Sequence, residues 1–484
     1  MRGARPVGGL RNLPVHVRVM LPGGIDRSGL PAEEGLAVTT ERRRQQPEAD
    51  RNGASPRRDA PAATAAGPPR RPRFALHTFD SLKDRHFRWF FSASMSQMAS
   101  MQMQQVMRSY VAFLITGSYA ALGIVALAGS IPALIFSLVG GAIADRIPQK
   151  KWAVQVGQAV TAVNSLAIAV LLYTDLIRLE HLVIAAVVQA MQMALVMPSR
   201  QSMIPELVGT GDRLMNAVAL NAAGMNSVRL FAPALGGFLA AAFGAAWVYF
   251  LMTAMYLLAM MLMFQVPDTT TAERAPRGSF KREASDALRN IWLGLKYMKQ
   301  ERTIGALLVV NLLIVICSMP YMFLLAGFVM DVLGEGPDTI GMLISVGAVG
   351  SLISALTIAS RPWRRRGRIF LLGSAFQGLF LFLAFTVSTS ALMMMPLMFL
   401  MGIGQSLRQS LSNVLVQTYV DNDYRGRVMS IYMMQMSLAQ FGAFAGGIVA
   451  AMLGPRVALG GLAMLVVIIS LGAFVFVPRL RNLD

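Results

Sequence analysis

The sequence has 484 residues, of which 55% are hydrophobic and only 14% are charged. Soluble domains carry about a quarter charged residues, so this composition and a mean hydropathy of +0.53 exclude an ordinary soluble protein and indicate a membrane protein. The net charge of +19 is concentrated in an N-terminal segment and in short loops, which argues against nucleic-acid binding. The single cysteine, Cys317, excludes an intrachain disulfide and is expected to pack in the core.

The chain begins with a basic segment. Residues 1–73 are rich in Arg, Pro, Gly and Ala without hydrophobic periodicity, which predicts a disordered tail. Residues 74–88 are expected to form a short interfacial helix that leads into the first span. The first span is expected to serve as the signal for membrane insertion, because no secretory signal peptide is recognised before it.

Long apolar runs follow, separated by short breaks. A membrane span needs about 20 residues. Twelve runs fit: 89–114, 121–144, 152–173, 182–199, 214–242, 247–266, 303–330, 339–359, 369–387, 391–414, 428–453 and 457–477. The expected fold is therefore an all-α membrane protein with twelve transmembrane helices. Its expected parts are an N-terminal six-helix bundle (74–266), a cytoplasmic central loop (267–302), a C-terminal six-helix bundle (303–478) and a C-terminal tail (479–484). Within the loop, Lys281–Arg302 has helical character, with Ile291, Leu295 and Met298 on one side.

The distribution of Lys and Arg predicts the orientation. These residues gather in the breaks on the side of the basic tail, where Arg200 and Arg408 are also placed, whereas the opposite side holds only Arg178 and Arg456. Cytoplasmic loops carry the excess of Lys and Arg, so both termini are expected in the cytoplasm. The predicted location is the inner (plasma) membrane, crossed many times.

The two halves of the chain resemble each other. Arg200-Gln201-Ser202-Met203 stands before the fifth span, and Arg408-Gln409-Ser410-Leu411 stands before the eleventh. A basic break also follows the second span of each half. This duplication predicts two parallel six-helix pseudo-repeats, as in two-half transporters.

The strongest motif lies between the second and third spans. It is Gly141-Ala-Ile-Ala-Asp145-Arg146-Ile-Pro-Gln-Lys150-Lys151. The motif resembles the signature of the major facilitator superfamily. Gly141 permits close helix approach, and Asp145 can cap a helix end and pair with a cation in one conformation only, which would bias the inward/outward equilibrium. The expected gating motif is therefore Gly141, Asp145, Arg146, Lys150 and Lys151.

Further segments resemble one branch of that superfamily, the drug:proton antiporters that include enterobactin exporters and macrolide efflux proteins. These segments are Pro198–Val208, Asn216–Asn221, Arg229–Gly237 and a second-half loop motif of Arg425, Gly426 and Arg427 after Tyr424. The resemblance covers about residues 75–480 and implies two bundles rocking about a central cavity, export from the cytoplasm and a proton gradient as the driving force. One departure is Ala232, where the family usually has Gly before the proline. Another is that no Asp, Glu or His stands in the middle of a predicted span, so proton coupling rests on the resemblance alone.

Charged and polar residues inside the spans are candidates for the cavity. Arg108 ends a polar stripe of the first span that contains Ser94, Gln97, Met101, Gln104 and Gln105 within an arc of about 100°. Arg229 shares a face with Asn226, and Tyr432 shares a face with Gln435. The candidate substrate-cavity residues are Gln97, Gln104, Arg108, Asn226, Arg229, Tyr432 and Gln435. The alternatives are that Arg108 snorkels to the membrane surface, that Arg229 bonds neighbouring helices, and that the other residues pack between helices.

These features predict a secondary transporter that exports small amphiphilic molecules. A cavity with both arginines would favour anionic or neutral cargo, such as a catecholate siderophore, over a lipophilic cation. The alternatives are an uptake carrier or uncoupled facilitator on the same fold, and a non-transporting membrane scaffold. No P-loop, Ser-His-Asp or metal-ligand cluster indicates an enzyme, and the 34 methionines are expected to fill the core rather than to carry copper. The expected partners are a small-molecule substrate, the lipid bilayer and a proton gradient, with no nucleic acid, cofactor or metal, and the protein is expected to be a monomer.

Overall fold

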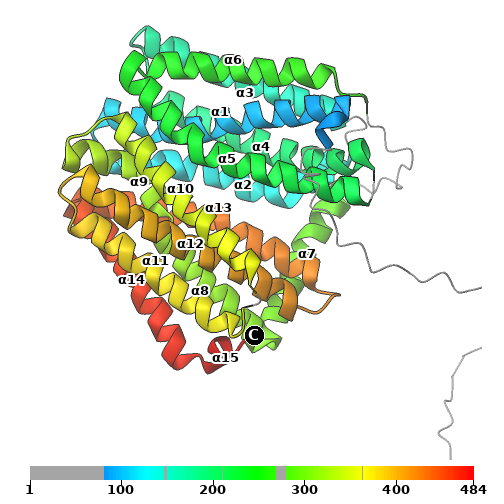
Figure 1. The fold of residues 1–484 in the computed structure, drawn as a ribbon, viewed down its shortest axis with the longest axis vertical. Helices are drawn as coiled ribbons and strands as arrows, with labels where there is room; N and C mark the ends of the chain where they lie inside the picture. The colour runs from blue at the N-terminus through cyan, green and yellow to red at the C-terminus, as the bar shows by residue number, and fades with distance from the viewer. Residues whose placement is uncertain (1–80, 147–149, 210, 269–279, 362) are drawn as a thin grey trace, which may run out of the picture. The chain divides into compact units, whose positions relative to one another are not determined.

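The computed structural model describes residues 81–146, 150–209, 211–268, 280–361 and 363–484, and within these ranges the side chains of 137–146, 195, 212 and 280–287 are outside the description. Every regular element in the described part of the chain is helical (Figure 1). The predicted disordered tail, 1–73, and the start of the predicted interfacial helix lie outside the described residues.

Six long helices make up the first half. They are α1 (Arg85–Thr116), α2 (Tyr119–Arg146), α3 (Lys150–Tyr173), α4 (Leu179–Val208), α5 (Asp212–Phe243) and α6 (Ala245–Phe264). The side chain of Asp84 caps the start of α1 by accepting hydrogen bonds from the backbone N–H groups of His86 and Phe87. Gly117 ends α1 in the left-handed conformation, so that α2 begins after a turn of two residues.

The second half follows the connecting helix α7 (Phe280–Gln300). It contains α8 (Arg302–Ser318), α9 (Pro320–Phe328), the π-helix η2 (Val329–Leu333), α10 (Pro337–Ser360), α11 (Arg366–Thr386), α12 (Ala391–Tyr419), α13 (Arg425–Leu453), α14 (Pro455–Phe476) and α15 (Pro478–Arg481). The predicted seventh span thus comprises α8, α9 and η2. It breaks before Pro320, which has no backbone N–H to continue the hydrogen-bond ladder of α8.

Eleven helical segments among the described residues are long and apolar enough to cross a membrane. The helix α1 has the length but is not one of them, since it contains several Gln and Ser side chains and Arg108. The helices α4 and α12 extend past the predicted ends of their spans at 199 and 414. Arg200 lies one residue past the predicted end of its span, and Arg408 lies inside the predicted span 391–414. The structure buries both within helices, so their assignment to breaks between helices was wrong.

Helix packing repeats between the halves, as the sequence duplication predicts. In the first half α2 packs on α4 and α3 packs on α6. In the second half α10 packs on α12 and α11 packs on α14, which are the corresponding helices in order. The halves meet along two equivalent pairs, α5 with α10 and α2 with α13.

The close contacts between the halves lie near one end of the bundle. We call this the short-loop end, formed by the ends of α1, α5, η2 and α13 and the starts of α2, α6, α10 and α14; the opposite end is the basic end. A Cβ atom on Gly341 would lie 2.3 Å from the carbonyl oxygen of Pro233, and one on Gly447 would lie 2.6 Å from that of Tyr119. Only glycine permits such backbone contact between helices. The hydroxyl of Tyr119 also donates to Asp331 Oδ2 at 3.0 Å across the halves.

The connecting helix α7 packs at the basic end, against α13 and α2 (Figure 1). The Tyr297 ring stacks on that of Tyr424 at 4.4 Å between centroids, and the Tyr297 hydroxyl donates to Asp421 Oδ2 at 3.2 Å. The predicted helical character of this segment is confirmed. Its apolar face includes half-buried Ile291 and Met298, whereas Leu295 is exposed.

Candidate functional site

A narrow crevice lies between the two halves. The polar side chains of Gln102, Gln105 and Ser109 on α1 form part of its wall. The remaining lining comes from Val106, Pro233, Met322, Ala326, Ile340 and Ile344 of α1, α5, α9 and α10. Because both halves contribute, movement of one half against the other would change the shape of this crevice.

The predicted cavity residues of α1 pack inside the first half. Gln158 Nε2 of α3 donates to Gln97 Oε1 at 3.3 Å, and the Tyr256 hydroxyl of α6 donates to Gln104 Oε1 at 3.0 Å. Arg108 lies within electrostatic range of Tyr256 and of its neighbour Tyr249. These side chains thus face α3 and α6, and the adjacent face of α1 lines the crevice. A direct role for them in binding cargo stays a prediction.

Arg229 and Asn226 are exposed on α5. Arg229 lies within electrostatic range of Tyr321 on α9, in the other half of the chain. Tyr321 is also within electrostatic range of Arg408 on α12. One buried phenol therefore lies near a cation from each half.

Arg408 is the centre of a buried polar network in the second half. Its side chain is 4% exposed; its Nε donates to Gln377 Oε1 at 3.0 Å and its Nη1 to Asn311 Oδ1 at 3.4 Å. Asn311 Nδ2 donates in turn to Gln435 Oε1 at 2.6 Å, and Gln435 Nε2 donates to the carbonyl of Leu308 at 2.9 Å. All these partners are neutral. The cation is therefore solvated by amides and has no carboxylate partner in the described part of the chain.

Two tyrosines extend this network. The Tyr432 hydroxyl is 2.8 Å from Ser412 Oγ and within electrostatic range of Arg408, and the Tyr321 hydroxyl donates to Gln405 Oε1 at 3.4 Å. The structure thus brings the predicted pair Tyr432 and Gln435 together around Arg408, although their contact with cargo stays a prediction. The described residues contain no group of three or more His, Cys, Asp or Glu side chains placed to hold a metal.

Arg200 is the counterpart of Arg408 in the first half. It is 7% exposed, and its Nη2 lies 3.5 Å from the sulfurs of Met98 and Met197. The burial of both arginines was missed from the sequence, which assigned them to breaks between helices on the basic side. The repeated Arg-Gln-Ser motif was the signal that could have identified them, since it occurs at the same place in both halves.

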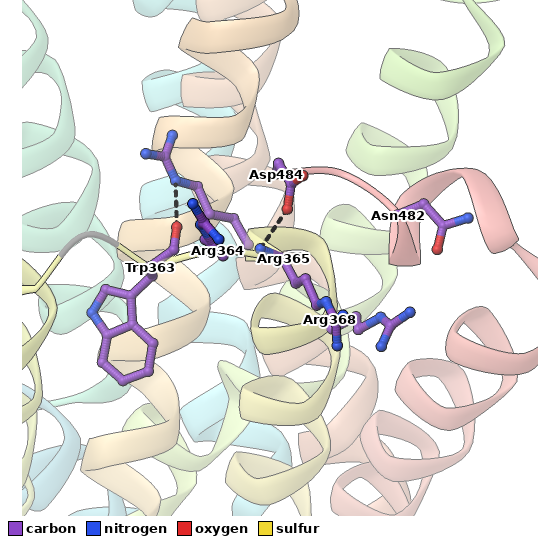
Figure 2. A pocket seen from close by; sticks show the side chains of 7 residues that line it. Trp363, Arg364, Arg365, Arg368, Asn482 and Asp484 are labelled. Carbon is purple, nitrogen blue, oxygen red and sulfur yellow. Dashed lines mark hydrogen bonds between the residues drawn. The ribbon is translucent and has the colours of Figure 1, made fainter.

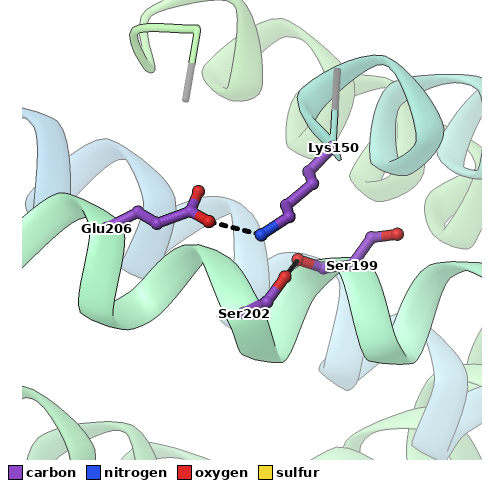
Figure 3. Close-up of polar contacts among 4 residues, drawn as sticks. All are labelled: Lys150, Ser199, Ser202 and Glu206. Atoms are coloured by element: carbon purple, nitrogen blue, oxygen red, sulfur yellow. Dashed lines mark hydrogen bonds and ion pairs between the residues drawn. The ribbon is translucent and has the colours of Figure 1, made fainter. Parts of the chain in front are cut away.

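The second part of the predicted gating motif joins three helices of the first half. Lys150 Nζ, at the start of α3, forms an ion pair with Glu206 near the end of α4 (Figure 3). Lys151 Nζ donates to the carbonyl of Phe264 at 3.3 Å and lies 3.4 Å from Asp268 Oδ1. The side chains of Gly141, Asp145 and Arg146 lie outside the described residues. The described contacts fix the basic ends of α3, α4 and α6 relative to one another.

The second-half loop motif contacts the connecting helix. Arg427 Nε donates to Asn290 Oδ1 of α7 at 3.3 Å, and its guanidinium lies 5.3 Å from the centroid of the Tyr424 ring. Arg425 and Gly426 are exposed at the start of α13. Burial raises the pKa of the nearby Tyr297 hydroxyl above its ordinary value, so this group stays protonated at neutral pH and can donate to Asp421.

We expect the Lys150–Glu206 ion pair to contribute modestly to transport. The substitution Glu206→Lys places two cations together and should lower the initial transport rate about threefold, within the range for partly exposed ion pairs. The double variant Lys150→Glu/Glu206→Lys restores opposite charges and should recover most of the rate. Initial rates at equal protein amounts measure both; a double variant as slow as the single one would show that the pair itself does not matter.

The structure has two helical halves, and both contribute residues to the crevice between them. This is the arrangement of a two-half membrane transporter. Residues 76–484 match the family of transmembrane secretion effectors. The chain therefore belongs to this family of the major facilitator superfamily.

Relatives that are named as transporters, one of them as an efflux pump, support the class. The chain is 26% identical to the MFS-type transporter YfiS of Bacillus subtilis, over 66% of this chain and 75% of that protein. It is 27% identical to the multidrug efflux pump Tap of Mycolicibacterium fortuitum, over 76% of this chain and 90% of that protein. It is 23% identical to the staphyloferrin A transporter of Staphylococcus aureus, over 74% of this chain and 87% of that protein.

Solved transporters share the fold. A mutant form of the peptide transporter POT superposes with a TM-score of 0.69 at 14% identity, over 82% of this chain and 95% of that one. At this identity the likeness defines the fold alone. It confirms the prediction of a major facilitator fold, whereas the expected count of twelve spans stays a prediction.

Proposed function

We propose that this protein exports small amphiphilic molecules from the cytoplasm across the inner (plasma) membrane by alternating access. The observation that carries the proposal is the crevice between the halves, which is lined by α1, α5, α9 and α10. The close contact between Gly341 and Pro233 borders it, because Pro233 lines the crevice and Gly341 lies between the lining residues Ile340 and Ile344. Rocking of the halves about this crevice would expose its lining alternately to the two sides of the membrane.

The distribution of charge supports loading from the cytoplasm. Outside the N-terminal segment the arginines and lysines gather at the basic end, so we infer that this end and both termini lie in the cytoplasm with twelve spans between them. The backbone contacts at Gly341 and Gly447 then close the outer side. In this conformation cargo would enter the crevice from the cytoplasm, as an exporter requires.

The buried cations favour an anionic or neutral cargo. Arg200 and Arg408 are nearly inaccessible, and among the described residues their hydrogen-bond partners are sulfur atoms or neutral amides. Arg229 lies near the same phenol as Arg408. An uncompensated cation inside the membrane is costly, so a cargo with an anionic group would be bound there in preference to a lipophilic cation. Siderophore-like amphiphiles carry such groups, and one relative bears the name of a siderophore transporter.

A proton gradient is the proposed driving force. Coupling needs an ionisable group whose contacts change as the halves move. Asp331 has such a position, because it accepts a hydrogen bond from Tyr119 of the other half. Removing its charge in Asp331→Asn would remove any coupling that runs through this carboxylate.

The test is accumulation in efflux-deficient cells that express the protein, with an anionic catecholate and a cationic dye measured in parallel. We expect the anion to be depleted, and its depletion to stop when the proton gradient is collapsed. Asp331→Asn should retain some depletion but lose the dependence on the gradient. Depletion of the dye instead would contradict selection by the arginines, and depletion unaffected by the collapsed gradient would contradict proton coupling.

A further inference from the structure

An arginine-lined pocket, separate from the crevice, lies at the basic end. Its cavity of about 880 Å³ is bounded by the loop between α10 and α11 and by the C-terminal segment. Four of its lining residues are Arg364, Arg365, Arg366 and Arg368, and the others are Trp363, Asn482 and Asp484 (Figure 2). Four cations from five consecutive positions thus border one cavity.

Most of these cations have no side-chain partner among the described residues. Arg366 Nε donates to the carbonyl of Trp363 at 3.3 Å. In the described part of the chain, no carboxylate lies within ion-pair distance of any of the four guanidinium groups. Arg368 Nε and Trp363 Nε1 are buried donors without a hydrogen-bond acceptor. Buried donors normally have acceptors, so this pocket has unused capacity to bind an anion.

The loop is held in shape by backbone contacts. Arg365 adopts the left-handed conformation, with φ of 60°, which is unfavourable for a residue with a side chain. Asp484 Oδ1 accepts from the backbone N–H of Arg365 at 2.6 Å (Figure 2). The Leu483 carbonyl accepts from the N–H of Gly367 at 2.9 Å. The Asp484 carboxylate therefore holds the backbone of the loop, and the guanidinium groups remain available.

The equivalent loop of the first half is different. There Lys150 pairs with Glu206 (Figure 3). Lys151 pairs with Asp268, so the chain itself supplies both anions. The loop between α10 and α11 has the same position in the second half but no such acidic partners among the described residues. Within the described part of the chain, these guanidinium groups therefore have no acidic side chain paired with them.

We propose that this pocket binds the phosphate of an anionic phospholipid headgroup. Arginine forks match phosphate oxygens, and basic pockets between transmembrane helices at the cytoplasmic surface suit such headgroups. The pocket is at the start of α11, a helix of 21 residues whose N-terminal end also favours an anion. Leu356 on α10 and Leu372 on α11 are 64% and 48% exposed one to two turns away, where acyl chains would lie. A lipid thus fits both the charge and the apolar surroundings, whereas free phosphate fits only the charge.

The test measures lipid retention by the full-length protein in nanodiscs of phosphatidylcholine with a minor share of phosphatidylglycerol. The pocket variant is Arg364→Gln/Arg368→Gln, and the matched control is Arg213→Gln/Arg479→Gln, which removes two exposed arginines outside the pocket. After extraction into detergent, native mass spectrometry counts the phosphatidylglycerol that stays bound. We expect retention to fall about 25-fold in the pocket variant, at about fivefold for each basic residue removed, and to be unchanged in the control.

Three outcomes would overturn the proposal. Equal loss in both variants would mean attraction by overall charge, and unchanged retention in the pocket variant would mean that lipid binds elsewhere. Displacement of the retained lipid by inorganic phosphate at millimolar concentration would identify a site for the free anion. The unfolding temperature in phosphatidylcholine alone should match in all three proteins, so that loss of lipid is not loss of fold. This test does not depend on the direction or cargo of transport.

Discussion

Replacing Arg408 with Gln should lower the transport rate of an anionic cargo about 100-fold. Gln377 and Asn311 solvate the guanidinium but cannot replace its charge, so the variant loses the cation that attracts the anionic group. Removing one partner of a buried, hydrogen-bonded charge pair costs about 2–5 kcal/mol, and about 2.7 kcal/mol corresponds to 100-fold. Initial transport rates in proteoliposomes, at equal protein amounts, measure the effect.

Two controls separate this role from a structural one. Arg408→Lys keeps the charge but loses the planar fork, and should have an intermediate rate. Because Arg408→Gln removes a buried charge without a carboxylate partner among the described residues, its unfolding temperature should equal or exceed that of the unchanged protein. A lower unfolding temperature together with an equal loss for anionic and neutral cargo would show instead that Arg408 supports the fold.

The second large effect is expected from Gly341→Ala. The new methyl group would lie 2.3 Å from the Pro233 carbonyl oxygen and 3.0 Å from Ala234 Cα, so backbone atoms of α5 would have to move. Packed helices resist such movement, and the contact between the halves at the short-loop end should open. We expect the transport rate to fall more than about tenfold, because the cycle needs this closed state.

Labelling with an impermeant thiol reagent tests the cause. In a Cys317→Ser background, a cysteine introduced at Ser109 lines the crevice and should react from the short-loop end only when Gly341→Ala is also present. Gly472→Ala on α14 is the matched control, since nothing lies within 4 Å of the added methyl group. Normal transport and unchanged labelling in Gly341→Ala would mean that the helices separate slightly without opening the crevice.

Most of the helices could be predicted from the sequence because a membrane span must bury about 20 apolar residues and satisfy its own backbone. The ends of α4 and α12 could not be predicted in this way. The predicted spans end at 199 and 414 because hydropathy falls there, whereas α4 continues to Val208 and α12 continues to Tyr419. Both Arg200 and Arg408 are buried within these helices. The same limitation applies to the break at Pro320, which divides one predicted span into α8 and α9.

The candidate functional site was harder to predict from the sequence than the fold. The sequence placed Gln97, Gln104 and Arg108 on one face of α1, but the rotation of that helix depends on packing with α3 and α6. The network around Arg408 joins side chains from α8, α11, α12 and α13. No local pattern links residues so distant in the chain, and only the repeated motif marked Arg408 in advance.

The polarity of α1 has a consequence for how the protein enters the membrane. Each Gln, Ser or Arg makes insertion of an isolated helix less favourable, so α1 would not be a stable span by itself. The apolar helix α2 follows after only Gly117 and Ser118. The two helices are therefore expected to be released from the translocon into lipid as a hairpin, with α2 providing most of the favourable transfer free energy. The polar face of α1 would have no packing partners until α3 and α6 are synthesised. The correct rotation of α1 would therefore be established only when the first half is complete.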